Sequence, residues 1–335
     1  MITAGNIAVS LCPVFVFLGA LIWLDSYKLI RVRNVILTIA GGSVAAIAAF
    51  LCNSILVDNV AMGFTTFARY VSPLVEESVK ILHLIVLFRT RRIGFMVDAA
   101  IYGFAIGAGF AFIENIYYLQ SIDDPNLLLW VIRGLGTAMM HGGTTAIYGI
   151  VTKYFIDRHA RSPVLMYIPG LLFAVAIHSL YNHFLLPPII SALGIMIFLP
   201  MILMAIFKKS EQLTRAWLGV GLDADIELME RITAGQFSDS NIGKYLHTLT
   251  SRFPPEVIVD MLCLLRLQTE LSMRAKGVLM MREAGFREEQ SEEIREKFSE
   301  LKFLEKSIGA TGKIAIAPIL HTTSQDLWQL YLAKE

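Results

Sequence analysis

Charged side chains are scarce in this chain of 335 residues, at 17% of the total, and there are only three cysteines. In addition, 55% of the residues are hydrophobic and the mean hydropathy is +0.60. This composition excludes an ordinary soluble domain. The cysteines have no metal-ligand spacing and do not indicate a disulfide framework. The sequence also lacks an HExxH motif, which argues against a metalloprotease of that type.

The hydrophobic residues form long runs, each near the length of about 20 residues that crosses a bilayer core. Seven runs occupy residues 6–24, 35–57, 63–88, 95–119, 127–155, 164–187 and 189–207. The first is interpreted as a span and not as a signal peptide, because no basic segment precedes it. The sequence therefore predicts an all-α fold, a polytopic membrane helix bundle of about seven spans over residues 1–207.

Basic residues follow the first, third, fifth and seventh runs, whereas the alternate loops carry acids. The basic residues are Lys28, Arg31, Arg33, Arg89, Arg91, Arg92, Lys153, Arg158, Arg161, Lys208 and Lys209. Because positive loops stay in the cytoplasm, this distribution predicts a cell-membrane protein with an external N-terminus and a cytoplasmic C-terminus.

Residues 208–335 have a different composition, in which charged residues alternate with apolar ones at helical spacing. Val257, Met261 and Leu264 are one such set. We predict a C-terminal helical cytoplasmic domain here. Its basic and acidic side chains nearly balance, which argues against nucleic acid as a partner. Two interpretations stay open: a small helical domain with its own apolar core, and a regulatory or dimerising module that would form a homo-oligomer.

Ionisable residues inside the apolar runs are the strongest indication of function. Glu76, Glu77 and Lys80 lie near the middle of the third run, where a charge costs about 2.5–3.5 kcal/mol. A structural interpretation is available for two of them, because Glu76 and Lys80 at i, i+4 can form an intrahelical ion pair. Glu77 has no basic residue at i±4, which favours a carboxylate tuned for acid–base chemistry.

The next two runs carry one acid and one histidine among small residues. Phe110 and Glu114 are one turn apart, and Asn115 follows directly. His141 lies near mid-membrane, and Arg133 stands eight residues earlier on the same face. A histidine within a span is often only a hydrogen-bonded part of the core, but the depth of His141 matches that of the glutamates.

His178 and Asn182 in the sixth run are spaced i, i+4, so both side chains point into one site. This pair suits a metal ligand with a supporting amide, or two donors that face a developing oxyanion. We therefore expect a polar catalytic chamber within the bundle, formed by residues of four consecutive runs.

In this order, the residues resemble the PrsW family of intramembrane proteases, within the larger group that holds the CAAX prenyl endopeptidases. The matching residues are Glu76-Glu77-x-x-Lys80, Phe110-x-x-x-Glu114-Asn115, His141 and His178-x-x-x-Asn182. The resemblance implies cleavage of a membrane-anchored protein, with bacterial anti-sigma factors the known type of substrate. The prenyl endopeptidases have EExxxR and FxxxH instead, and this departure argues against a prenylated substrate.

The hypothesis is hydrolysis by glutamate-activated water. The resemblance favours Glu76 as the base, with Glu114 or His141 positioning the water and with His178 and Asn182 stabilising the oxyanion. Lys80, Phe110 and Asn115 would support the site.

The cofactor is left open between none and zinc. In the zinc alternative, the candidate ligands are His141, His178 and Glu114, and a further glutamate would be the base.

Two other classes of function use the same residues. Buried Glu, His and Lys also serve as proton relays in proton-coupled membrane transporters, although no internal repeat supports this alternative. A non-catalytic membrane sensor with a cytoplasmic helical readout is the third hypothesis. The protease hypothesis ranks first, with a single-span membrane protein in the same lipid bilayer as substrate.

Overall fold

The structure is a computed structural model that describes residues 3–27, 30–158, 164–236, 238, 240–284, 286 and 292–320. Every element in these ranges is a helix. The chain divides into two compact units, Met1–Ser210 and Glu211–Glu335, which are described separately below.

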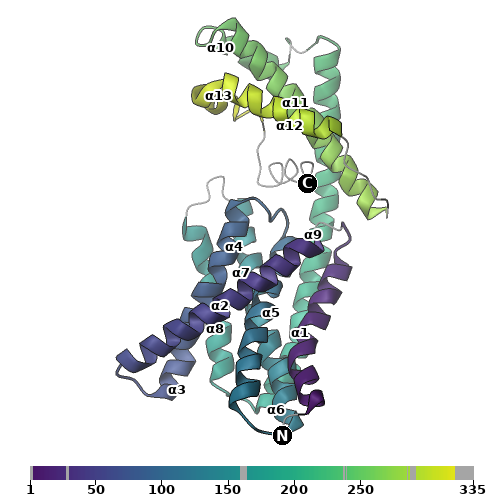
Figure 1. The fold of residues 1–335 in the computed structure, drawn as a ribbon. Coiled ribbons are helices and arrows are strands. Elements are labelled where there is room, and N and C mark those ends of the chain that lie inside the picture. Colours follow the sequence, from purple (N-terminus) through teal and green to yellow (C-terminus); the bar gives the residue numbers. More distant parts are fainter. Residues whose placement is uncertain are drawn as a thin grey trace. The chain divides into compact units, whose positions relative to one another are not determined.

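The first unit is a bundle of long helices, several of which include short segments of other helical types (Figure 1). Its elements are α1 (Ala4–Leu24), α2 (Val32–Asn59), α3 (Phe64–Thr66), η1 (Phe67–Val71), α4 (Ser72–Arg89), α5 (Met96–Ser121), α6 (Leu127–Val131), η2 (Ile132–Thr137), α7 (Ala138–Arg158), η3 (Val164–Tyr167), α8 (Ile168–Asn182) and α9 (Pro188–Thr233). The segments η1 and η2 are π-helical. They join α3 to α4 and α6 to α7 without a break in the chain's helical path.

Five described helical segments are long and apolar enough to cross a membrane: α1, α2, α5, Val164–Asn182 and α9. This confirms a helical, multi-pass membrane protein. The two other predicted spans correspond to the helical stretches 64–89 and 127–158. Polar and charged residues make the composition of both stretches less typical of a span, and a π segment divides each of them into shorter α-helices.

Helix α5 is the centre of the bundle. Its apolar window is 83% buried, against 17–33% for the other four candidate spans. Glycines let its neighbours approach closely: a Cβ on Gly107 would lie 2.2 Å from the backbone oxygen of His141, and one on Gly103 would lie 2.5 Å from that of Thr145. Because lipid gives helices little hydrophobic reason to associate, such close backbone packing is a main source of stability. It also fixes the height of His141 on α7 relative to α5.

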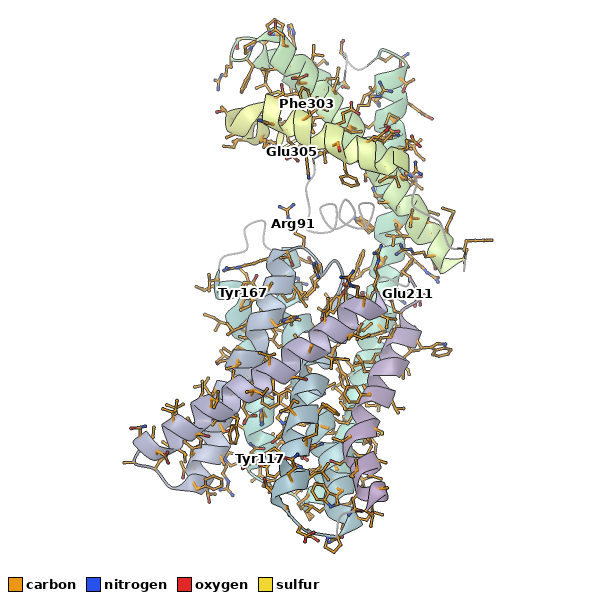
Figure 2. The ribbon with its side chains drawn as sticks, viewed as in Figure 1. Arg91, Tyr117, Tyr167, Glu211, Phe303 and Glu305 are labelled. Carbon is orange, nitrogen blue, oxygen red and sulfur yellow. The ribbon has the colours of Figure 1, made fainter. Side chains whose placement is uncertain are left out.

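The bundle has two chemically different ends. Arg91 and Tyr167 lie at one end of it, and Tyr117 lies toward the other (Figure 2). Arg91 follows α4 and belongs to the basic loops on which the predicted orientation depends. Lys28 and Arg161, which also entered that prediction, lie outside the described residues.

The second unit contains the remainder of α9, then α10 (Asn241–Leu249), α11 (Pro255–Glu283), α12 (Glu292–Ser307) and α13 (Gly309–Ile316). Pro254 and Pro255 begin α11, as prolines in a first turn commonly do. A core of leucines, isoleucines and Met261 lies between α10, α11, α12 and α13. The helix that starts as the last predicted span continues without a break through Lys208 and Lys209 to Thr233.

Candidate active site

A cavity of about 570 Å³ lies within the first unit. Five of the six catalytic residues predicted from the sequence line it: Glu76, Glu114, His141, His178 and Asn182. The sixth, Glu77, is fully buried beside them. The remaining walls come from α2, the α3–η1 segment, α5, η2 and the end of α8, and they are mostly apolar, with Arg133 of η2 among them. The structure therefore brings together at one chamber the four helices that carry the predicted catalytic residues: α4, α5, α7 and α8.

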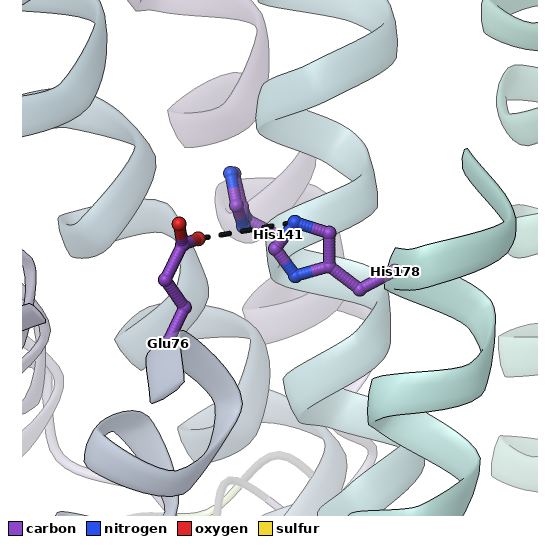
Figure 3. A group of neighbouring side chains, drawn as sticks. All are labelled: Glu76, His141 and His178. Carbon is purple, nitrogen blue, oxygen red and sulfur yellow. Dashed lines mark ion pairs between the residues drawn. The ribbon is translucent and has the colours of Figure 1, made fainter. Parts of the chain in front are cut away.

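Glu76, His141 and His178 point toward one another from three different helices (Figure 3). One ligand atom from each lies within 4.8 Å of the others, a spacing that suits a metal ion. His178 Nε2 lies 3.8 Å from Glu76 Oε2, and the two imidazole rings are 4.9 Å apart in a T-shaped arrangement. Glu114, which the sequence suggested as a ligand, is not in this group.

Glu76 is held in place from its own helix and from α2. Ser72 Oγ donates to Glu76 Oε1 at 2.6 Å, and Asn53 Nδ2 donates to the same oxygen at 3.4 Å. Asn53 also donates to Ser72 Oγ at 2.9 Å. Because these donors all engage Oε1, the other carboxylate oxygen, Oε2, faces the histidines.

Glu77 orients His178 from behind the cavity. Glu77 Oε1 lies 2.8 Å from His178 Nδ1 and also accepts hydrogen bonds from Lys80 Nζ at 2.8 Å and Thr144 Oγ1 at 3.3 Å. Since a carboxylate only accepts, Nδ1 of His178 carries the proton and Nε2 presents a lone pair to the cavity. Glu77 has no basic residue at i±4, as the sequence shows, but Lys80 pairs with it at i, i+3. The alternative pairing of Lys80 with Glu76 is not seen among the described residues.

His141 has a defined tautomer for the same kind of reason. Lys80 Nζ lies 2.8 Å from His141 Nδ1, and Glu114 Oε2 lies 3.0 Å from Nε2. An ammonium group can only donate, so Nδ1 accepts and Nε2 faces the carboxylate. Lys80 is also fully buried and lies 4.1 Å from the ring centre of Phe110, whose ring is 5.0 Å from that of His141.

Asn182 has a structural contact that the sequence did not indicate. In the π segment η1, the N–H of Ser72 bonds to Phe67 instead of Ala68, and Pro73 has no N–H to offer. The freed carbonyls are satisfied from α8: Asn182 Nδ2 donates to Ala68 O at 3.0 Å, and Ser179 Oγ donates to Arg69 O at 2.6 Å. Two side chains of α8 thus fix the turn that precedes Glu76.

Arg133 is a cavity residue to which the sequence gave no role. Its Nε donates to Asn115 Oδ1 at 2.9 Å, and Nη2 lies 3.3 Å from Glu114 Oε2. Asn115 in turn donates to the backbone oxygen of Ser10 at 2.9 Å. The sequence feature that could have indicated its role is its position eight residues before His141. The π segment η2 lies between the two residues and brings both side chains onto one face.

Comparison with known proteins identifies a family for this chain. The family model described as PrsW family intramembrane metalloprotease matches residues 31–207. The protease PrsW of Clostridioides difficile (strain 630) is 33% identical over 115 residues, which are 31% of this chain and 47% of that protein. The chain therefore spans about half the length of this curated relative. No solved structure matches at a significant level.

The family match runs from the start of α2 to the middle of α9 and includes every helix that supplies a side chain to the cavity. It confirms the resemblance drawn from the spacing of the glutamates and histidines. The chain belongs to the PrsW family of intramembrane metalloproteases.

Proposed function

We propose that this protein is an intramembrane endopeptidase that hydrolyses a peptide bond of a membrane-anchored protein, with zinc held by Glu76, His141 and His178. The observation that carries the proposal is the convergence of these three side chains in a cavity inside a helical bundle. Relatives of the same description support the class of reaction.

The donor types fit a zinc ion: His178 Nε2 already presents a lone pair, whereas His141 Nε2 would first have to give up the proton that faces Glu114. Two imidazole nitrogens and one carboxylate oxygen form a donor set used by catalytic zinc sites, which keep a further position open for water or substrate. Glu77 holds Nδ1–H of His178, so that Nε2 is free to bind, and such outer carboxylates are regular partners of zinc-binding histidines. When bound, zinc would polarise the scissile carbonyl and acidify a water molecule.

Within this arrangement Glu114 is the better candidate for the general base, in place of Glu76. Glu76 belongs to the ligand group, whereas Glu114 lies outside it, lines the cavity and reaches His141 Nε2 with Oε2. Glu114 takes a proton from the attacking water as its oxygen bonds to the carbonyl carbon. It then gives the proton to the leaving nitrogen as the C–N bond breaks, which yields a carboxylic acid and an amine.

His178 fits a metal ligand better than an oxyanion donor, since its Nε2 presents a lone pair and not a proton. The amide of Asn182 is likewise engaged with Ala68. We assign Asn182 to holding α8 against η1, which positions Glu76.

The proposed substrate is a single-span membrane protein, of the anti-sigma-factor type by family resemblance. The mostly apolar walls and the volume of the cavity suit an aliphatic segment of such a protein. We further propose seven spans, an external N-terminus and a cytoplasmic C-terminus. The helical unit that follows the bundle would then be cytoplasmic and would regulate or dimerise the enzyme.

The test is cleavage of a panel of tagged single-span membrane proteins by the purified full-length chain, together with metal analysis of the same samples. We expect a truncated product that disappears with Glu76→Gln, His141→Ala or His178→Ala, with zinc lost in each. A chelator should abolish cleavage, and added zinc should restore it. His183→Ala is the matched control, because His183 is on the same helix end but contacts Tyr70 and Ser179 instead of the site.

Cleavage that survives all three substitutions, or stoichiometric zinc that none of them removes, would contradict the proposal. Cleavage that needs the glutamates but resists chelation would favour the metal-free glutamate mechanism instead.

A further inference from the structure

Arg133 is a largely buried cation whose guanidinium nitrogen Nη2 is itself buried. Its side chain is 13% exposed, and Nη2 makes no hydrogen bond among the described residues. Nη2 is within ion-pair distance of Glu114 Oε2, at 3.3 Å, but directs no N–H at it. A buried donor without an acceptor destabilises the folded protein, and such groups in native proteins generally have a use.

The rest of the guanidinium group is fixed. Asn115 accepts from Nε at 2.9 Å, and the guanidinium carbon lies 3.7 Å from the ring centre of Tyr118. Asn115 is anchored in turn by the backbone of Ser10 on α1. Because Nε and one face of this planar group are engaged, Nη2 is restricted in position at the cavity that the arginine lines.

The π segment η2 produces this position. Ala138 donates its N–H to Arg133 O, five residues earlier, so one extra residue is taken up in the turn. In a regular helix, residues eight apart differ by about 80° in direction, whereas with one extra residue in a turn they nearly align. Arg133 and His141 consequently both reach the same atom, Glu114 Oε2.

We infer that Arg133 contacts the substrate: its Nη2 donates a hydrogen bond to the carbonyl oxygen of the scissile peptide and to the oxyanion that forms from it. This inference depends on the proposed peptidase function and adds to it the donor that neither His178 nor Asn182 provides. A rigid guanidinium beside the general base and the ligand histidine is suited to charge that develops only in the transition state. Removal of one such donor lowers kcat by about 10²–10³-fold.

The experiment compares Arg133→Lys and Arg133→Gln with wild type in the cleavage assay, with KM, kcat and bound zinc measured on each sample. We expect kcat to fall about 10²–10³-fold in both variants, while KM changes little and zinc content stays at the wild-type level. Arg158→Lys is the control, since the Arg158 guanidinium also lies over a tyrosine ring, that of Tyr154, but does not line the cavity. Guanidinium ion added to Arg133→Ala should restore part of the turnover, which only a folded protein with a vacated donor site can show.

Wild-type turnover in Arg133→Lys or Arg133→Gln overturns the inference and leaves the proposed function intact. Loss of zinc in proportion to lost turnover also overturns it, because Arg133 would then act by holding the metal site together. Absence of any guanidinium rescue counts against it in the same way. A wild-type protein that cleaves nothing removes the proposed function, and this inference with it.

Discussion

Glu77 Oε1 lies 2.8 Å from His178 Nδ1, so a carboxylate with no exposed surface fixes the ring of a histidine that lines the cavity. The adjacent Glu76 reaches the cavity itself, which gives two neighbouring glutamates different tasks. Glu76 belongs with the histidines as a ligand, and Glu77 holds one of those histidines from behind.

The first prediction concerns this second role. Glu77→Gln should weaken zinc binding about 10–100-fold, because an amide no longer supports the basicity and orientation of His178 as a carboxylate does. Zinc affinity measured by competition with a chelator of known affinity tests it. Glu227→Gln is the control, since Glu227 is exposed and belongs to an i, i+4 pair of the second unit. Unchanged zinc affinity in Glu77→Gln would show that Glu77 has only a packing role.

The second prediction concerns the buried Glu77–Lys80 pair. Both side chains are completely buried, so removal of one partner leaves an uncompensated charge that costs about 3–5 kcal/mol. We expect Lys80→Met to lower the free energy of unfolding by about that amount, and Glu77→Gln with Lys80→Met to recover part of the loss. Unfolding in mixed micelles measures both. Additive losses in the double variant would mean that the two side chains do not act as a pair.

Much of this site follows from the sequence. Ionisable residues are rare in apolar runs and are retained there for function, so Glu76, Glu114, His141 and His178 could be selected by type and depth alone. The partner of Lys80 could not be predicted from the sequence, because Glu77 and Glu76, three and four residues earlier, are both within reach on a helix. Glu77 also contacts His178, which lies on α8. This contact depends on the packing of α8 against α4, which the sequence does not give.

The π segments explain two further differences. Sequence periodicity assumes regular helices, so it did not indicate the contact of Asn182 with η1 or a place for Arg133 at the cavity. The extra residue in η1 frees the carbonyl that Asn182 binds, and the one in η2 turns Arg133 toward the cavity. The continuation of α9 past Phe207 was not predictable from apolar runs either. An amphipathic helix can follow a span when no proline or glycine signal ends it.

The third prediction tests the contact between α5 and α7. Gly107→Ala should lower the free energy of unfolding by about 1–3 kcal/mol, because the new methyl group would lie against the backbone of His141, which cannot move aside as a side chain can. Turnover should fall too, since His141 is displaced. Gly19→Ala is the control, because a Cβ at Gly19 meets nothing within 4 Å and alanine favours the helix by up to about 1 kcal/mol. Equal stability of the two variants would contradict the close packing.

The last prediction concerns the clamp on η1. Ser179→Ala and Asn182→Leu each remove the donor to a carbonyl that the π turn leaves without a helical partner, so each should cost about 1–3 kcal/mol. Because the carbonyls of Ala68 and Arg69 belong to the turn before Glu76, turnover should fall more steeply in the double variant than in either single one.

Thr233→Ala provides the comparison, because its hydroxyl bonds the carbonyl of Met229 at an exposed site where water can replace it, and we expect a change within about 0.5 kcal/mol. Hydrogen exchange of the amides of residues 67–72 distinguishes the cause. Faster exchange there, with the protection of α5 unchanged, locates the effect in the turn. A uniform loss of protection across the bundle would show instead that Ser179 and Asn182 stabilise the fold generally and do not position Glu76.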